Sequence, residues 1–285
     1  MQLRDIKQIY HQELNGIYAK EEIDTFFYWA IEHYLNIERF ALALRPDLRL
    51  SKEDEQPLFE TLAELKKEKP IQYIIGKAHF MDLEFMVNEN VLIPRPETEE
   101  LVQWILDECQ FERSRELHVL DIGTGSGCIA VSLAKNLPNA KVYALDVSEK
   151  ALKVAEKNAT LNGVDIKFFQ DDILNPELEL ELNFDVIVSN PPYVREQEKS
   201  RMRKNVIAYE PDKALFVPDN DSLVFYRAIT KFANENLKDK GSLFFEINQY
   251  LGNETKALLE AHNFSEIELR KDLFGNDRIL KGNKP

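Results

Sequence analysis

The sequence predicts an α/β fold in which a doubly wound, mostly parallel, Rossmann-like sheet follows a small N-terminal helical domain and a β-hairpin connector. From about residue 97 onward, short apolar segments alternate with amphipathic ones, the pattern of strands and helices in such sheets. Before about residue 70, apolar residues recur at the helical spacing of three and four. We therefore divide the chain into residues 1–70, 71–96 and 97–285.

The first region contains two clear amphipathic patterns. Pro57 could open the last helix of this region and Pro70 could close it, because proline is best tolerated at helix ends. The residues that carry the helical spacing are Ile23, Phe26, Phe27, Ala30, Ile31, Tyr34 and Leu35, then Leu58, Leu62 and Leu65.

The connector and the large region show strand patterns. The segment "HFMDLEFMVNENVLIP" alternates at Leu83, Phe85 and Val87 and contains the turn-like "NEN", which predicts a β-hairpin. Beyond it we predict strands at "LHVLDI", "KVYALD", "IKFFQ", "FDVIVSN" and "SLFFEI", separated by helical stretches such as "EKALKVAEKNATLNG".

Composition limits the classes of function. The 285 residues are 44% hydrophobic, enough for a substantial core, and the net charge of -14 opposes non-specific binding to a phosphate backbone unless a local basic patch overrides it. No apolar run approaches the roughly 20 residues that span a bilayer, and the start "MQLRDIK" lacks the apolar core of a secretory signal. Cys109 and Cys128 have no CxxC spacing, which favours a reducing compartment. We expect a cytoplasmic protein without a disulfide or metal site.

Candidate ligand-binding residues follow three successive predicted strands. In such sheets ligands bind at the carboxyl ends of the strands. The first strand is followed by the glycine-rich "GTGSGC", which allows a tight turn and close approach of a ligand, although such turns also occur only to pack a helix. The second ends at Asp146, placed to accept hydrogen bonds from ribose hydroxyls or to cap the next helix. Asp171 and Asp172 follow the third and could meet an adenine amino group or face solvent.

A fourth strand ends in the stretch "VIVSNPPYV". The apolar run predicts a buried strand that stops at Asn190. Pro191 and Pro192 have a fixed φ and restrict the residues before them, so the Asn190 amide and the Pro191 carbonyl are held at the strand end, next to Tyr193. The alternative interpretation is an ordinary proline-rich loop after a core strand.

The sequence resembles class I methyltransferases that use S-adenosylmethionine, through "LDIGTGSG", Asp146 and "SNPPY". Within that class, "QYIIGKAHF", "LIPRPETEELV" and "YEPDKALF" resemble the HemK/PrmC family of N5-glutamine methyltransferases of peptide chain release factors, over roughly Pro70 to the end of the chain. The resemblance implies a substrate clamp of Asn190, Pro191, Pro192 and Tyr193, and a cofactor site of Asp121, Gly123, Thr124, Gly125, Ser126, Gly127, Asp146, Asp172, Ile173 and Asn190.

The family also implies partners. We expect S-adenosylmethionine as cofactor and S-adenosylhomocysteine as product. Class I release factors would be the protein substrate. Residues 1–70 would either dock the release factor or only cover one side of the catalytic domain. We expect no stable nucleic-acid binding, no membrane association and a monomer. Three alternatives stay open: methylation of an exocyclic amino nitrogen of a DNA or RNA base, a dinucleotide-dependent oxidoreductase, and a binding module without turnover.

Four other features have simpler interpretations. Arg95 braces the turn before a helix that starts at Pro96. The segment "REQEKSRMRK" touches a protein substrate or forms a solvated, mobile loop, and we favour the loop. Cys128 and Trp104 are expected to pack in the core.

Overall fold

The structure is a computed structural model that describes residues 1–110, 115–177 and 182–285. The chain forms two compact units. The first consists of Met1–Gly76 together with the later segment Arg203–Tyr209. The second consists of Lys77–Met202 and Glu210–Pro285. Each unit has a buried apolar core of its own, so we describe the two units separately.

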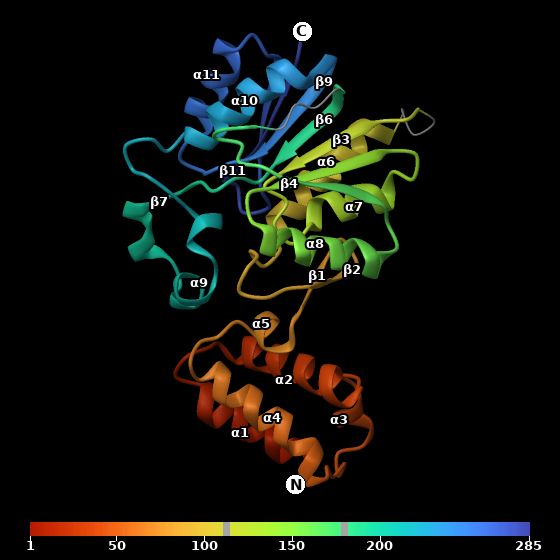
Figure 1. Ribbon diagram of the computed structural model, residues 1–285. Helices are drawn as coiled ribbons and strands as arrows, with labels where there is room; N and C mark the ends of the chain where they lie inside the picture. The colour runs from red at the N-terminus through yellow and green to blue at the C-terminus, as the bar shows by residue number, and fades with distance from the viewer. Residues whose placement is uncertain (111–114, 178–181) are drawn as a thin grey trace. The chain divides into compact units, whose positions relative to one another are not determined.

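The first unit is helical, as its sequence pattern predicts (Figure 1). Its core contains fully buried side chains from the first, second and fourth helices, among them Ile6, Phe27 and Leu58. The Arg203–Tyr209 segment joins this unit through a hydrogen bond of 2.9 Å from the Tyr209 hydroxyl to the Lys67 carbonyl. The helices are α1 (Leu3–Leu14), α2 (Lys20–Leu35), α3 (Ala41–Leu44), α4 (Lys52–Leu65), α5 (Ile71–Ile75) and α9 (Lys204–Tyr209).

The predicted roles of Pro57 and Pro70 are wrong. Helix α4 begins at Lys52, where Ser51 and Asp54 form a reciprocal capping box, and Pro57 lies inside the helix. The local hydrogen bonds of the capping box thus decide the start, while Pro57 only removes one backbone donor. The helix ends at Leu65, and Pro70 instead caps the beginning of α5.

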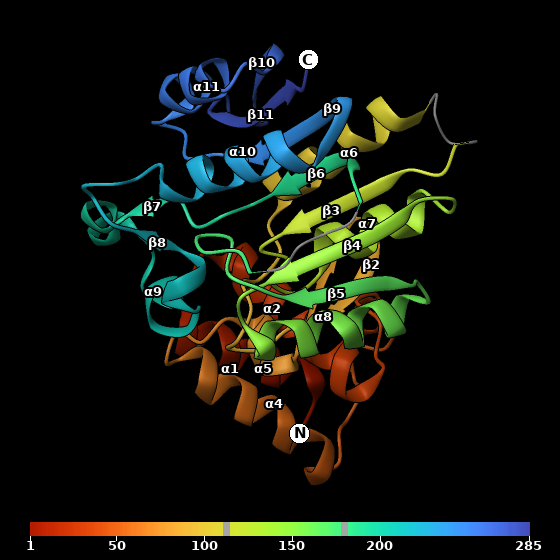
Figure 2. The same ribbon diagram turned by 45° about the horizontal axis from the view of Figure 1, so that its top comes forward.

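The second unit is built on a seven-stranded sheet with the order β10-β11-β9-β6-β3-β4-β5 (Figure 2). The pairs β9–β6, β6–β3, β3–β4 and β4–β5 are parallel, and β11 is antiparallel to both its neighbours. The mostly parallel sheet predicted from the sequence is confirmed. Its strands are β3 (His118–Ile122), β4 (Lys141–Asp146), β5 (Ile166–Gln170), β6 (Phe184–Ser189), β9 (Leu237–Glu246), β10 (Ser265–Lys271) and β11 (Asp277–Asn283).

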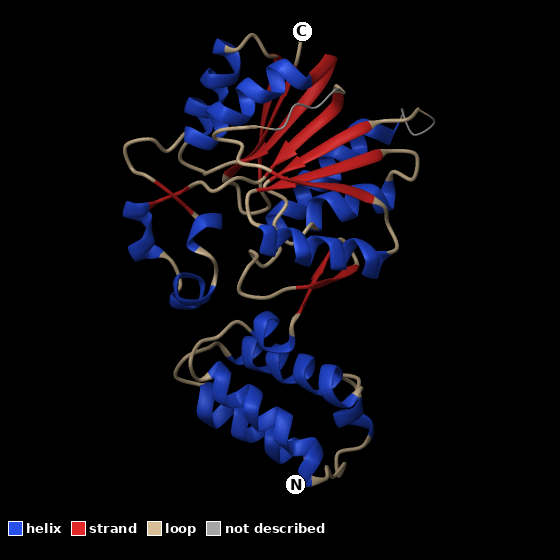
Figure 3. Ribbon diagram, viewed as in Figure 1, coloured by secondary structure: helices blue, strands red, loops and turns tan. Residues whose placement is uncertain are grey.

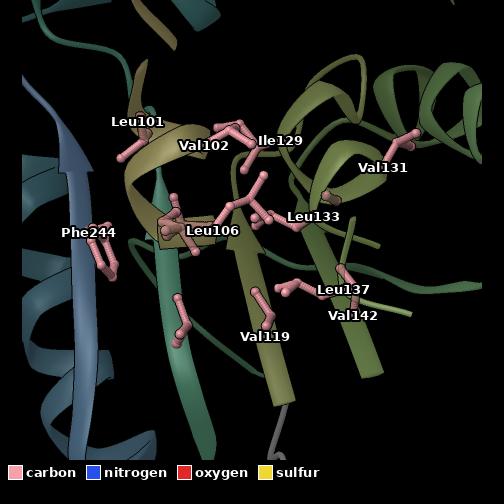
Figure 4. Close-up of a cluster of buried hydrophobic side chains, with 14 of the residues drawn as sticks. Leu101, Val102, Leu106, Val119, Ile129, Val131, Leu133, Leu137, Val142 and Phe244 are labelled. Carbon is pink, nitrogen blue, oxygen red and sulfur yellow. The ribbon is translucent and has the colours of Figure 1, made fainter. Parts of the chain in front are cut away.

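Helices pack on both faces of this sheet (Figure 3). One core cluster joins α6 and α7 to the sheet through side chains such as Leu101, Val119, Ile129 and Phe244, which Figure 4 draws as sticks. The cluster on the other face includes Tyr226 and other side chains of α10, and Leu259 of α11. The helices of the unit are α6 (Pro96–Cys109), α7 (Cys128–Asn136), α8 (Glu149–Asn162), α10 (Val224–Asn236) and α11 (Gly252–Ala261).

The connector is a β-hairpin of β1 (Lys77–Phe80) and β2 (Leu83–Met86). Its turn differs from the prediction, because Met81 and Asp82 form it with φ of 49° and 58°, whereas "NEN" follows β2. A type I′ hairpin turn needs positive φ at both positions, which the Met81–Asp82 pair adopts although its sequence does not favour it. The hairpin belongs to the second unit.

The excursion between β6 and α10 is only partly a loop. Two short strands near its ends, β7 (Val194–Arg195) and β8 (Phe216–Val217), pair in parallel with each other. The "REQEKSRMRK" segment contains a 3-10 helix, Glu196–Arg201, in which Glu198 accepts a hydrogen bond of 3.0 Å from the Arg195 side chain. Within the described ranges, no helix is long and apolar enough to cross a membrane.

Candidate active site

A cavity of about 350 Å³ opens at the carboxyl ends of the parallel strands. This volume lies within the range of pockets that hold small molecules. All the residues that line it belong to the second unit. They come from the carboxyl ends of β3, β4 and β6, from the segments after β2, β3, β4, β5 and β6, from the "EPDKALF" segment, and from α6, α7, α8 and α10. The predicted site residues among them are Gly123, Thr124, Gly125, Ser126, Asp146, Asp172, Ile173, Asn190, Pro191 and Pro192.

The glycine-rich loop is held by the end of β4. The backbone N–H groups of Gly123 and Thr124 both donate to the Leu145 carbonyl, at 2.8 and 3.0 Å. Gly127 has a φ of 81°, and a Cβ there would lie 3.0 Å from the Cβ of Ala155 in α8. Glycine is therefore required at position 127 both for backbone conformation and for packing against α8. Gly127 itself does not line the cavity.

Asp146 lies at the end of β4 and lines the cavity. Its carboxylate accepts hydrogen bonds from the backbone N–H of Gly125 at 2.8 Å and of Ser148 at 2.9 Å. Burial raises the pKa of Asp146, against the effect of these bonds. The helix-capping alternative is wrong, because the N-cap of α8 is Ser148, whose hydroxyl accepts from Ala151. Asp146 thus links the end of β4 to the glycine-rich loop.

Asp121 lies behind the loop and does not line the cavity. Its Oδ2 atom accepts from the Thr124 hydroxyl at 2.7 Å and from the Ala130 N–H at 3.3 Å. Within the described residues, Oδ1 is buried without a hydrogen-bond partner. Burial raises the pKa of Asp121 to about 7. Asp121 therefore links the Thr124 side chain to the first turn of α7 through one carboxylate oxygen.

The segment after β5 brings Asp171, Asp172 and Ile173 to the cavity wall. The two aspartates are half-buried, and their side chains bond to nearby backbone N–H groups, such as that of Leu174, which donates to Asp172 at 2.9 Å. Ile173 is buried. The two acidic residues therefore form a turn at the cavity and are not on a fully solvated surface.

Asn190 directly follows β6 and lines the cavity from the opposite side. Its Nδ2 atom donates to Glu246 at 2.9 Å and to the Thr98 hydroxyl at 3.2 Å. An amide whose nitrogen is engaged in this way presents its oxygen on the other side. Oδ1 is therefore the atom of this side chain that remains for a ligand.

The other residues of the "NPPY" stretch share this corner. Pro191 is buried, Pro192 is half-buried, and both line the cavity. Tyr193 is half-buried and is not among the cavity-lining residues that the structure describes. Its hydroxyl donates to Glu246 at 2.9 Å. Burial, and then the neighbouring carboxylate of Glu246, raise the pKa of Tyr193 well above its usual value.

Arg95 does more than brace the turn before α6. Its guanidinium forms an ion pair with Glu210, whose carboxylate also accepts from the Ile93 N–H at 3.2 Å. Arg95 lines the cavity, as do Pro211 and Lys213 directly after Glu210. The ion pair therefore fixes the "EPDKALF" segment to the wall of the cavity. Cys128 also lines the cavity and is only partly buried, whereas Trp104 is buried as expected.

The sequence reasoning missed Glu246, Thr98 and Glu210. Glu246 is the last residue of the buried strand β9, so a charged residue at the end of "SLFFE" was the available signal. Thr98 and Glu210 lie in "LIPRPETEELV" and "YEPDKALF", two of the segments that carry the family resemblance, and that position was their available signal.

Comparisons with known proteins show which family the chain belongs to. The family model of the methyltransferase small domain matches residues 101–215, and that of the PrmC N-terminal domain matches residues 11–76. Over 284 residues the chain is 54% identical to a release factor glutamine methyltransferase of Flavobacterium psychrophilum, covering 99% of each chain. The chain belongs to the release factor glutamine methyltransferase family. Another member, from Bacteroides thetaiotaomicron, is 43% identical over 96% of this chain and 97% of its own.

Solved structures show the same fold. The T. thermophilus 16S rRNA N2 methyltransferase RsmC, in complex with AdoMet and guanosine, matches 73% of this chain and 50% of its own, with a TM-score of 0.53 and 20% identity. A methyltransferase from Pyrococcus furiosus matches 82% of this chain and 99% of its own, with a TM-score of 0.51 and 18% identity. Likeness at this identity concerns the fold alone. The resemblance to the HemK/PrmC family, stated from the motifs, is confirmed by the full-length relatives.

Proposed function

We propose that this chain transfers the methyl group of S-adenosylmethionine to the side-chain amide nitrogen, N5, of a glutamine in peptide chain release factors. The target is the glutamine of their Gly-Gly-Gln motif, and S-adenosylhomocysteine is the second product. The observation that carries the proposal is the Asn190 amide, which lies at a strand end with its nitrogen bound and its oxygen left for a ligand. The family membership supports it.

The wall around the glycine-rich loop fits S-adenosylmethionine. Gly123 is exposed at the cavity with a φ of 75°, so no side chain blocks the approach of a ligand to the backbone there. Asp146 offers carboxylate lone pairs that its two backbone bonds leave free for ribose hydroxyls. Asp172 and Ile173 would hold the adenine. When bound, the cofactor supplies an electrophilic methyl group on a sulfonium.

The opposite wall orients the substrate amide. A glutamine nitrogen is a poor nucleophile, because its lone pair is delocalised into the carbonyl. The oxygen of Asn190 and the main-chain oxygen of Pro191 accept its two hydrogens and direct the nitrogen at the methyl group. Tyr193 does not line the cavity and would act through its hydrogen bond to Glu246. Rate enhancement then comes from positioning and from electrostatic complementarity as the nitrogen gains positive character, and the proton leaves late in, or after, the transfer.

The experiment is incubation with labelled S-adenosylmethionine, intact release factor and total RNA. Label on the release factor, located to the Gly-Gly-Gln glutamine by mass spectrometry, is the expected result. Label on RNA would instead support methylation of a base amino nitrogen, the alternative that the same clamp suits. Cofactor binding without any label would support a binding module. The location is cytoplasmic and the enzyme acts as a monomer in this proposal.

Residues 1–70 are proposed to dock a remote surface of the release factor, because one glutamine side chain offers little area for discrimination. Phe40 and Leu44 are exposed apolar residues of the first unit, at 69% and 78%. In the full chain, Phe40→Ser with Leu44→Ser should raise KM for the intact factor about tenfold, the effect of losing an interface hot spot. Activity on a short Gly-Gly-Gln peptide should stay unchanged. Unchanged activity on both substrates would argue against docking through this surface.

The matched control for that variant is the exposed apolar pair of the second unit. Leu273 and Phe274 are 87% and 77% exposed at the turn between β10 and β11. Leu273→Ser with Phe274→Ser should leave KM for the intact factor unchanged. An equal loss in both pairs of substitutions would point to a general effect of surface apolar residues.

A further inference from the structure

A buried carboxylic acid lies directly behind the clamp. Glu246, the last residue of β9, is 1% exposed and does not line the cavity. Its Oε2 atom accepts from Asn190 Nδ2 at 2.9 Å and from the Thr98 hydroxyl at 2.6 Å. Its Oε1 atom accepts from the Tyr193 hydroxyl at 2.9 Å. One acid thus holds side chains from α6 and from two positions of the "NPPY" stretch.

Such a group is costly to bury. Removing an ionised carboxylate from water costs several kcal/mol unless partners offset it. The three hydrogen-bond donors to Glu246 are all neutral side chains. Burial raises the pKa of Glu246, although bonds from Thr98 and Tyr193 and the charge of Arg278 act in the opposite direction. An apolar residue at the end of this strand would avoid that desolvation cost, since Phe244 and Phe245 before it are fully buried.

Asp185 offers a useful contrast on the neighbouring strand. It is also a buried acid with three donors, but two of them are the cations Arg115 and Lys238, and the third is the His118 N–H. It lies near the beginning of β6, whereas Asn190 follows the end of that strand. Asp185 therefore braces the sheet through charge pairing, while the bonds of Glu246 lead to the clamp.

The orientation of the Asn190 amide matters for the chemistry. If its nitrogen faced the cavity, it would present a donor to the substrate NH₂ group, which also donates, and the two groups could not bond. Rotation by 180° would also bring Asn190 Oδ1 against Oε2 of Glu246. Since Oε2 accepts two hydrogen bonds and Oε1 only one, a proton on the acid would sit on Oε1, and Oε2 would remain an acceptor for Asn190.

We propose that Glu246 is a positioning residue, which locks the Asn190 amide with its oxygen toward the cavity and so selects a substrate that offers an amide NH₂ group. This inference rests on the proposed function and deepens it. The acid acts through Asn190 and does not itself contact the substrate. Thr98 and Tyr193 hold the acid in place from the other sides.

The test compares two substitutions of similar length. Glu246→Met has no acceptor, so only the Thr98 hydroxyl remains beside the Asn190 amide, and its freed hydrogen can bond a rotated amide oxygen equally well. We expect kcat to fall about 100-fold, the loss typical of one preorganised polar group, with KM for S-adenosylmethionine unchanged. Glu246→Gln keeps one carbonyl oxygen for Asn190 Nδ2 and can turn its own amide nitrogen toward the Tyr193 oxygen. It should recover kcat to within about fivefold of the original, as the loss of one hydrogen bond of about 1 kcal/mol implies.

A control and an independent readout keep the proposal falsifiable. Asp185→Leu also removes a buried acid, and it should lower the unfolding temperature without lowering kcat. If the kcat values of all three variants simply follow their stabilities, Glu246 is only a structural residue and the proposal is wrong. Equal kcat losses in the Gln and Met variants would also overturn it.

If Glu246→Met does not fold, NMR on the unaltered protein still decides. The side-chain NH₂ group of Asn190 should exchange its hydrogens slowly with solvent, since Nδ2 donates both to Glu246 and to the Thr98 hydroxyl. Fast exchange of both would overturn the lock. This measurement does not require turnover, so a failure to methylate release factors would count against the proposed function alone.

Discussion

The two walls of the cavity are each braced by a buried acid, but the acids find their partners over very different sequence distances. Asp121, behind the glycine-rich loop, bonds to residues three and nine positions away. Glu246, behind the clamp, bonds to residues 53, 56 and 148 positions away. The acid behind the loop therefore finds its partners in the nearby chain, whereas the acid behind the clamp finds its partners only once the sheet has assembled.

The kind of contact differs as well. The loop wall is shaped by backbone: by positive φ at its glycines and by N–H groups that donate to Leu145 and Asp146. The clamp wall is shaped by side chains that must each hold a particular rotamer. Substitutions in the loop should thus act on stability and cofactor affinity, while substitutions in the clamp should act on the methyl-transfer step.

The strongest test of this difference is Asn190→Ala. Loss of one preorganised acceptor should slow methyl transfer by about two to three orders of magnitude and leave cofactor affinity nearly intact. Single-turnover kinetics and calorimetry with S-adenosylmethionine measure the two effects. Asn162→Ala, which removes an amide that donates to the carbonyls of Glu84 and Asn158, is the matched control and should keep the original rate. Near-normal turnover of Asn190→Ala would refute the clamp.

Gly127→Ala tests the loop wall. A left-handed alanine costs about 1 to 2 kcal/mol, and crowding against Ala155 adds about 1 to 3. We expect a loss of about 2 to 5 kcal/mol in the free energy of unfolding, measured with urea. Gly123 has a similar φ, but a Cβ there would meet no atom within 4 Å. Gly123→Ala should therefore lose only the roughly 1 to 2 kcal/mol of the left-handed backbone. Equal losses in the two variants would show that packing against α8 is unimportant.

The sequence predicts most of the fold because its signals are local. The apolar runs mark β3, β4, β5, β6 and the end of β9, and the rule that ligands bind at the carboxyl ends of strands brings the glycine-rich loop, Asp146 and Asn190 to one cavity. Glu246 and Thr98 could not be linked to Asn190 in this way, because their contacts depend on strand order and register.

Local competition explains the other errors. Pro57 was expected to open a helix, but the capping box of Ser51 and Asp54 starts it earlier and offsets the lost hydrogen bond. The hairpin turn falls on Met81 and Asp82, since the pairing of β1 with β2 fixes the turn more strongly than the turn preference of "NEN". In both cases several weak contacts outweigh one strong residue preference.

Asp146→Ala addresses the link between β4 and the loop. If its carboxylate binds the ribose hydroxyls, cofactor affinity should fall by about 1.5 to 3 kcal/mol, the range for hydrogen bonds to a charged group. Calorimetry would record a dissociation constant roughly 10 to 150 times higher. The control is Ser148→Ala, which removes the cap of α8 but leaves the Ser148 N–H that donates to Asp146. It should weaken stability and not affinity, and an unchanged affinity in Asp146→Ala would exclude the ribose contact.

The last comparison concerns pH. Burial raises the pKa of Asp121 from 3.8 to about 7, so the native state holds this proton more tightly than the unfolded state. The contribution of Asp121 to stability is therefore fully present below about pH 4 and is lost as the pH rises toward about 7. Urea unfolding of the cofactor-free protein between pH 4 and 8 should show this loss, and Asp121→Asn should reduce it.

Asp272 should change the stability with pH in the opposite direction in the same experiment. Burial alone would raise the pKa of Asp272, but hydrogen bonds from the Asn276 backbone and from Arg278 lower it below its ordinary value. Its contribution is present above the ordinary pKa of an aspartate and is lost as the pH falls. Asp272→Asn should thus cost more stability at pH 7 than at pH 4. If Asp121→Asn and Asp272→Asn changed the pH dependence of stability in the same direction, burial would not raise the pKa of Asp121.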